Sequence, residues 1–371
     1  MEQLDHSVYD MRHMAVATAA QKAGLDAILV VSDWRQKGNL RYLADRVVWS
    51  RWCYIVLKAG SEPTLVMIAP SQRHWAEREG GIRDVRFSHH PEEEVVEVLR
   101  SVCPQGGMVG IAGMKDTIRV DALEYLQTNL PNIEFSEASS VMENVRMKKT
   151  PDEIDGLRNS MSIAEDAFNL FGELLAPGVT PWEIVGEVER ILRGRGCYDT
   201  MILLSTGPYL REPGQTVFQE GDFVMFSIEN AGPEGYWVER GGMFSLGPPS
   251  ETARRLHGLC VQTLDEVTPL LTPGRQVADV ADRVGTILRE GGFDIGIWGG
   301  HGIGLDVLEP PILLPDEDQV LQEGTVIGFH PHVVDHDTGL GGYISDVLLV
   351  TEGGGEALSQ TGHTLRVVPT T

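Results

Sequence analysis

The chain has 371 residues, enough for two or three domains, and its composition is ordinary for a globular protein. A formal net charge of -24 argues against binding to nucleic-acid phosphates and against docking on anionic membranes. The four cysteines show no CxxC spacing, no apolar run approaches the roughly 20 residues that span a bilayer, and the N-terminus does not resemble a signal peptide. We therefore expect an acidic, cytoplasmic protein that binds neither nucleic acid nor membrane.

Residues 1–147 alternate helical and strand-like patterns. Residues 9–24 have helical apolar spacing that ends at a glycine, and residues 27–31 form the continuous apolar run of a buried strand. Further strand-like runs lie at residues 54–57, 64–68 and 109–112, and helical stretches at residues 92–102 and 121–129. This alternation predicts a small α/β domain.

The second domain is expected to span residues 148–371. Near its start, Thr150 is followed by proline and, three residues on, by Glu153, which is the pattern of a capping box at a helix start. Thr180 and Glu183 repeat the same pattern. The domain therefore should open with two long helices.

This second domain contains an internal repeat. The Leu-Leu-x-Pro-Gly sequence at residues 174–178 recurs at 270–274, and each copy precedes an amphipathic run. Residues 220–227 resemble 323–330, and a Gly-Tyr pair occurs at both 235–236 and 342–343. The repeat predicts two α+β units related by a pseudo-twofold axis, with strands near residues 223–229, 236–244, 326–332 and 344–350. Equivalent positions facing a shared pocket would be Ser227 with His330, Glu239 with Asp346, and Ser205 with His301.

Two histidines are the main candidates for chemistry. His301 lies in the Gly-Gly-His-Gly-Ile-Gly segment at residues 299–304, where the glycines let the backbone approach a ligand closely. His330 is two residues before His332, so a strand would place both on one face. Together with the Asp-rich residues 335–337, the two histidines indicate a metal site. The alternative is a solvent-exposed loop that happens to carry histidines.

Carboxylates and tyrosines provide further candidates. Glu239 and Asp346 could share a proton, bind a cation or clamp a cationic nitrogen, unless Glu239 pairs with Arg240 at the surface. Candidates for substrate binding are Ser227, Glu229 on the same strand face, and the repeat-related Tyr236 and Tyr343.

Arg51 lies in an aromatic-rich segment directly before a predicted strand. Its guanidinium could bind a substrate carboxylate through two hydrogen bonds, or it could simply stack on the neighbouring Trp52.

Taken together, these motifs resemble the creatinase, prolidase, aminopeptidase P and methionine aminopeptidase superfamily. The resemblance covers nearly the whole chain and includes residues 39–43, 146–154, the two Pro-Gly helices, Gly221-Asp222, both Gly-Tyr pairs, the His301 segment and residues 346–352. It implies a creatinase-type N-terminal domain, a C-terminal domain of α+β class with the pita-bread fold, and a homodimer.

The resemblance also implies where metal ligands would lie. The family's peptidases hold two metal ions through two aspartates, one histidine and two glutamates. His301 matches the histidine, and Glu239 falls one residue beyond an aspartate position. The other aspartate position is Ser227, one glutamate position is His330, and the last falls on Ser345 or Asp346; the family's second catalytic histidine is Leu308. The sequence therefore lacks the carboxylates for a dinuclear site.

Creatinase and ectoine-hydrolase-like proteins resemble the chain in having lost metal ligands, and Arg51 falls where creatinase has a carboxylate-binding arginine. The leading hypothesis is a cofactor-free hydrolase of a C–N bond in a small carboxylate-bearing metabolite, with lyase or isomerase chemistry left open. His301 or His330 would transfer the proton, while Glu239 and Asp346 would orient water or bind a cationic nitrogen. A second hypothesis has one Zn or Fe ion on His301, His330 and Glu239. A third is a non-catalytic binding module.

Overall fold

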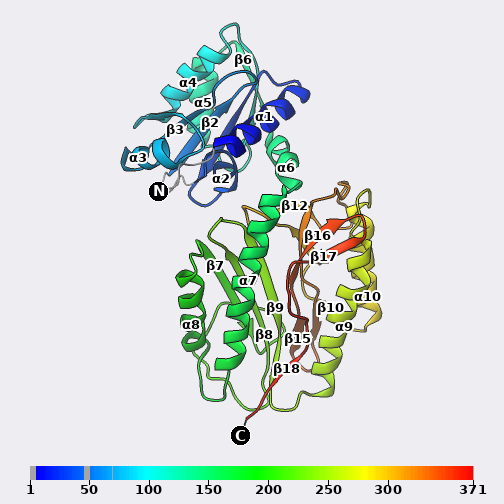
Figure 1. Ribbon diagram of the computed structural model, residues 1–371. Coiled ribbons are helices and arrows are strands. Elements are labelled where there is room, and N and C mark those ends of the chain that lie inside the picture. The colour runs from blue at the N-terminus through cyan, green and yellow to red at the C-terminus, as the bar shows by residue number, and fades with distance from the viewer. Residues whose placement is uncertain (1–5, 46–50, 69, 371) are drawn as a thin grey trace. The chain divides into compact units, whose positions relative to one another are not determined.

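The computed structural model describes residues 6–45, 51–68 and 70–370. The chain divides into two compact units, Met1–Arg146 and Met147–Thr371 (Figure 1). None of the helices in the described ranges combines the length and apolar character that crossing a bilayer requires.

The N-terminal unit is built on one six-stranded mixed sheet with the strand order β4-β3-β2-β1-β5-β6. Its strands are β1 (Ala27–Asp33), β2 (Trp52–Leu57), β3 (Thr64–Met67), β4 (Asp84–Phe87), β5 (Gly107–Ala112) and β6 (Ile133–Glu137). Its helices are α1 (His6–Lys22), α2 (Gly38–Ala44), α3 (Pro70–Glu79), α4 (Pro91–Val102), α5 (Val120–Asn129) and α6 (Ser139–Met147), the last ending at the unit boundary. The apolar runs of β1 and β5 are buried against α4 and α5, which confirms the predicted α/β fold.

The first half of the C-terminal unit packs two helices on a four-stranded sheet. The helices are α7 (Pro151–Leu174) and α8 (Pro181–Gly194), and the sheet has the order β18-β9-β8-β7. Its strands are β7 (Asp199–Ser205), β8 (Phe223–Ala231), β9 (Trp237–Leu246) and β18 (Arg366–Val368). Phe171 of α7 stacks on Phe226 of β8 with ring centroids 3.6 Å apart, in a core that also includes residues of α8.

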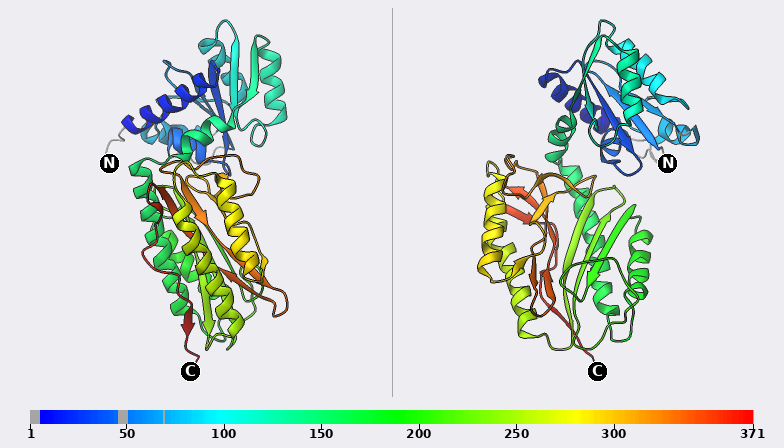
Figure 2. Two further views of the ribbon diagram at one scale, coloured as in Figure 1. Left: turned by 90° about the vertical axis from the view of Figure 1, so that its right-hand side faces the viewer. Right: turned by 180° about the vertical axis from the view of Figure 1, so that it is seen from behind.

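The second half repeats this plan with α9 (Glu251–Val267) and α10 (Val277–Glu290), separated by the short helix η1 (Thr268–Leu270). One sheet has the order β12-β11-β13-β16-β17 and a smaller one the order β10-β14-β15. These strands are β10 (Asp294–Ile295), β11 (Gly300–Gly302), β12 (Glu309–Ile312), β13 (Val326–Phe329), β14 (His332–Asp335), β15 (Leu340–Tyr343), β16 (Asp346–Thr351) and β17 (Gly354–Ala357). Figure 2 shows the two helix pairs on opposite sides of the unit with the strands between them.

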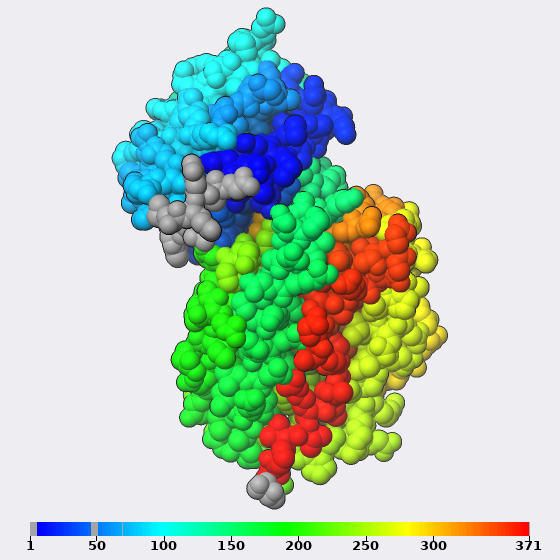
Figure 3. Space-filling view, in the orientation of Figure 1, coloured from blue at the N-terminus to red at the C-terminus, as the bar shows by residue number. Residues whose placement is uncertain are grey.

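The two halves meet along their strands. A β-bridge joins Gly241 of β9 to Ser345, which directly precedes β16. The C-terminal segment then crosses back, because β18 pairs in parallel with β9 of the first half. In Figure 3 this segment runs along the surface between the helices of the two halves. Side chains from both halves can therefore reach the space enclosed by the strands.

Two local predictions have different outcomes. Both capping boxes are present: Thr150 and Glu153 exchange their side-chain and backbone bonds at the start of α7, as do Thr180 and Glu183 at the start of α8. The single strand expected over residues 326–332 is wrong. It ends at Phe329, because Pro331 has no amide hydrogen to continue the ladder, and His332 begins β14 in another sheet.

Candidate metal centre

A cavity of about 340 Å³ opens between the strands of the C-terminal unit. Polar side chains line one part of it and apolar or aromatic side chains line the rest. The polar members are Glu229, Glu239, His301, His330, His332 and Tyr343. Cavities of this size that combine an apolar wall with a few converging polar groups are typical of small-molecule sites.

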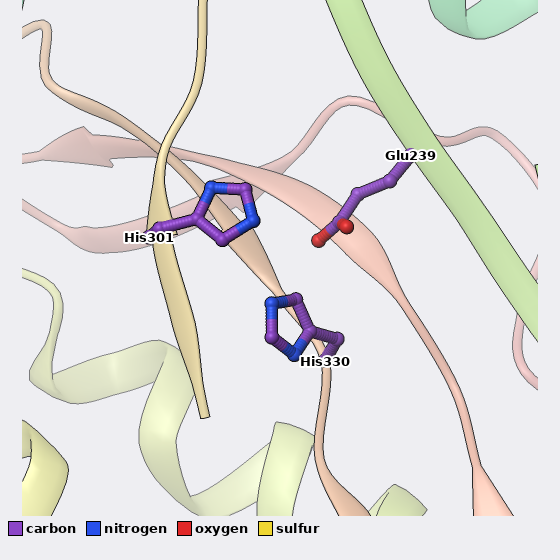
Figure 4. A group of neighbouring side chains, drawn as sticks. All are labelled: Glu239, His301 and His330. Carbon is purple, nitrogen blue, oxygen red and sulfur yellow. The ribbon is translucent and has the colours of Figure 1, made fainter. Parts of the chain in front are cut away.

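Three of these residues form a compact group. Glu239 lies on β9, His301 on β11, and His330 directly follows β13. Each offers one ligand atom, and these atoms all lie within 4.8 Å of one another. All three side chains are buried, and Figure 4 shows them pointing toward a common point. Two imidazoles and one carboxylate converging in this way form a candidate metal site.

The local sequence creates room for this group. A Cβ atom at Gly328 would lie 2.6 Å from Glu239 Oε1, so a side chain there would displace the carboxylate. A Cβ atom at Gly302 would lie 2.2 Å from the Pro310 carbonyl oxygen, at the bulge where β11 pairs with β12. Glycine at 302 therefore lets β12 pack closely against the strand that carries His301.

One unpaired atom of the group suits a metal ion. Among the described residues, Glu239 Oε1 is buried and has no hydrogen-bond partner. His330 Nδ1 is also unpaired, but Figure 4 shows Nε2, and not Nδ1, pointing toward the other two side chains. His301 Nδ1 lies 2.9 Å from the Gly302 carbonyl and must donate to it, which leaves Nε2 with its lone pair. Such unsatisfied buried atoms are costly without a ligand.

Burial also sets the charge state of the imidazoles. It lowers the pKa of His301 and, together with the nearby His301, lowers the pKa of His330 to about 3. Both histidines are therefore neutral at physiological pH, which is the form that binds metal. Burial and the neighbouring Glu229 raise the pKa of Glu239.

The remaining polar wall surrounds this group. Tyr343 lines the cavity and its hydroxyl lies 3.3 Å from Ser227 Oγ, while burial raises the pKa of the phenol. His332 Nε2 donates to the Pro208 carbonyl at 2.9 Å. Burial raises the pKa of Glu229, which lies opposite Glu239 on the neighbouring strand, to about 7.

The structure does not bring every predicted site residue to the cavity. The Asp346 carboxylate accepts hydrogen bonds from Ser359 and from His363 Nε2 and does not line the cavity. Tyr236 instead donates from its hydroxyl to Glu153 at 3.2 Å. Ser205 accepts a hydrogen bond from the Gly207 amide and lines a different pocket.

Arg51 belongs to the N-terminal unit. Its guanidinium lies over the Trp52 ring, 4.3 Å from the ring centroid. The stacked arrangement considered from the sequence is therefore present, and a role in binding a substrate carboxylate stays a prediction.

Sequence reasoning missed most of the apolar wall. Leu203 and Met201 of β7 line it together with Tyr209, Trp298 and Leu308 from loops. No motif marks these residues, although Leu308 occupies the position where the resemblance places a histidine. Only Met201 and Leu203 could have been predicted, because residues two apart on a strand lie on the same face.

Comparison with known proteins agrees with this fold and identifies the family. The sequence model of metallopeptidase family M24 matches residues 155–352, more than half of the chain, and that of the creatinase/prolidase N-terminal domain matches residues 12–148. The chain belongs to metallopeptidase family M24. This M24 protein therefore has a creatinase-type N-terminal domain and a pita-bread C-terminal domain, and it is a member of a hydrolase family.

Individual relatives are distant but extensive. The chain is 26% identical to an Xaa-Pro dipeptidase of Lactobacillus helveticus over 69% of this chain and 72% of the relative. It is also 26% identical to an ectoine hydrolase of Halomonas elongata over 95% of both chains. A solved Xaa-Pro dipeptidase from Bacillus anthracis has the same fold, with a TM-score of 0.85, 21% identity, and coverage of 97% of this chain and all of that one.

The expectation that the M24 protein uses no metal or other cofactor is wrong. The chain belongs to a metallopeptidase family, and its structure gathers Glu239, His301 and His330 into one group of side chains that could hold a metal ion. The sequence reasoning counted the missing carboxylates and gave too little weight to His330, which supplies a second imidazole in place of a carboxylate.

Proposed function

We propose that this M24 protein is a hydrolase that binds one divalent metal ion through Glu239, His301 and His330 and cleaves a C–N bond in a small molecule. The observation that carries the proposal is the convergence of these three ligand atoms within 4.8 Å at the wall of a cavity. The names of the relatives, an Xaa-Pro dipeptidase and an ectoine hydrolase, support hydrolysis of a C–N bond as the reaction class.

The donor set fits zinc or ferrous iron. Imidazole suits both metals, and two histidines with one carboxylate leave coordination positions open for water and substrate. A metal ion would also satisfy the buried Oε1 of Glu239, which has no partner among the described residues. In this proposal His301 and His330 bind the metal through neutral imidazole nitrogens, and neither is assigned the proton transfer.

The residues present support one ion rather than two. A pair of ions needs carboxylates that bridge them. Ser227 occupies a position where the family resemblance places a carboxylate ligand, and another such position falls on Ser345 or Asp346. The neutral hydroxyl of a serine is a poor substitute for a carboxylate. The Asp346 carboxylate is already hydrogen-bonded to Ser359 and His363.

Other side chains would bind and shield the substrate. A metal ion held at this site would act as a Lewis acid that polarises the scissile group. The buried Tyr343 keeps its proton, so its hydroxyl can donate a hydrogen bond to an oxygen that gains negative charge during attack. Leu203 and the exposed Trp298 would cover the substrate and exclude water from the reacting bond.

Metal analysis combined with activity tests this proposal. Protein purified without chelator, then stripped and reloaded with zinc or ferrous iron, should hold one ion per chain and hydrolyse members of a panel of dipeptides and cyclic amidines. His301→Gln and His330→Gln should each lower metal affinity by at least about 10-fold and abolish turnover. His336→Gln is the matched control, because the His336 side chain is 58% exposed and lies outside the cavity. Two ions per chain, or full metal affinity in both ligand variants, would contradict the proposal.

A further inference from the structure

Glu229 is a buried acid without a partner. Its side chain is 8% exposed and lines the same cavity as the candidate metal ligands. No described residue donates a hydrogen bond to its carboxylate or forms an ion pair with it. Buried carboxylates in proteins are normally paired or bound to a cation, so this one is expected to have a partner that comes from outside the chain.

The position of Glu229 on the sheet strengthens the expectation that a partner from outside the chain binds its carboxylate. Glu229 of β8 lies directly opposite Glu239 of β9 in the antiparallel register, so both side chains emerge on the same face. Like charges in directly opposed positions destabilise a sheet, and burial removes the water that would screen them. A metal ion bound to Glu239 would neutralise the charge of one of these two carboxylates. Glu229 stands outside the group of three ligand atoms and is left for a second cation.

The rest of the cavity wall suits an organic cation. No lysine or arginine is present among the residues that line the described cavity, so nothing there would repel a positive group. Trp298 and Tyr209 line the same cavity, and the faces of aromatic rings attract guanidinium and ammonium groups. A second metal ion fits less well, because no described group of three or more ligand side chains includes Glu229.

We propose that Glu229 determines substrate specificity by binding a cationic nitrogen of the substrate, such as an amidinium, guanidinium or ammonium group next to the C–N bond. This inference rests on the proposed function, since it assigns a substrate class to the same cavity. Glu229 selects amidines and amine-bearing amides over neutral compounds of the same shape. The carboxylate gains the partner that it lacks in the free protein, and the ligand is oriented toward the group of Glu239, His301 and His330.

A matched pair of ligands tests this role. Benzamidine carries a cationic amidinium, whereas benzamide has nearly the same shape and is neutral, and both are small for a cavity of about 340 Å³. Titration calorimetry on the zinc-loaded full chain should show benzamidine binding at least about tenfold more tightly than benzamide, as expected for a charge-assisted hydrogen bond. Glu229→Gln should bring the ratio close to one while leaving benzamide affinity and zinc content unchanged.

Two further variants complete the design. Asp294→Asn removes the same charge from a side chain that is 74% exposed, and it should keep the full preference. Glu229→Asp retains the negative charge and should keep part of the preference for benzamidine. A Glu229→Gln protein that still prefers benzamidine overturns the inference, and so does a zinc content that falls from two to one in this variant, because Glu229 would then be a metal ligand. If no zinc binds to the wild type, the proposed function fails, while the same titration on the metal-free chain still decides the role of Glu229.

Discussion

Replacing Glu239 by methionine should have opposite effects on the metal-free and the metal-loaded protein. The Glu239 side chain is 1% exposed, its Oε1 has no hydrogen-bond partner among the described residues, and it faces Glu229 across the sheet. Methionine has nearly the same length and no polar atom. The substitution therefore removes an unsatisfied group from the metal-free protein and a ligand from the metal-loaded one.

The magnitudes follow from these two roles. An unsatisfied buried polar group costs about 1–3 kcal/mol, so metal-free Glu239→Met should be more stable than metal-free wild type by about that amount. Zinc at 100 times its dissociation constant should stabilise the wild type by about 2.7 kcal/mol and should not stabilise the variant. For a unit of this size each kcal/mol shifts the melting temperature by about 2–4 °C.

Glu309→Met is the matched control. Glu309 is also a buried glutamate of the C-terminal unit, but it accepts a 3.0 Å hydrogen bond from the buried Lys149 ammonium. Its loss leaves that ammonium without its partner carboxylate and should destabilise the unit by about 3–5 kcal/mol. Thermal unfolding of both variants, with and without zinc, measures the difference. If metal-free Glu239→Met melts as far below wild type as Glu309→Met does, the reasoning about an unsatisfied Glu239 is refuted.

Two further predictions concern stability away from the cavity. Thr150→Ala removes the hydroxyl that accepts a hydrogen bond from the Glu153 amide and should lower the free energy of unfolding by about 1 kcal/mol. Thr180→Ala should cause a similar loss at the start of α8. Urea unfolding measures both variants, and unchanged midpoints in both would contradict the prediction. In the N-terminal unit, burial lowers the pKa of His13, whose Nε2 donates to the Leu43 carbonyl at 2.7 Å. Because protonation then favours the unfolded chain, this unit should lose stability as pH falls below about 6.5. The protection of its amides against hydrogen exchange, relative to the unfolded chain at the same pH, should depend less on pH in His13→Gln than in the wild type. An identical pH dependence of protection would rule out this role for His13.

The structure brings together three residues that the sequence analysis had singled out, Glu239, His301 and His330. His301 was identified from its glycine-rich segment, and His330 from its equivalence to Ser227. Both signals can be read directly from the sequence, one as a run of glycines and the other as the similarity of residues 220–227 to 323–330. The structure places the two rings 5.2 Å apart between centroids. Their convergence with Glu239 needed only that the two halves pack strand against strand.

The apolar wall could not be predicted in the same way. Tyr209, Trp298 and Leu308 belong to connecting segments, and their positions depend on contacts with residues far away in the sequence. The Pro208 carbonyl, for example, is held by His332, 124 residues further along the chain. Loop positions of this kind depend on the completed fold and have no periodic pattern of their own.

The sequence repeat and the register of the sheets align different residues with Asp346. The Gly-Tyr motif aligns these two acids, but the sheets align other residues: Phe226 pairs with Gly242 in the first half, and the equivalent Phe329 pairs with Asp346 in the second. The structural counterpart of Asp346 is therefore Gly242, three residues beyond Glu239. Because side chains alternate along a strand, a shift by an odd number of residues moves a side chain to the opposite face. Asp346 accordingly turns from the cavity toward His363, and its loss from the site removes a carboxylate that a second metal ion would need.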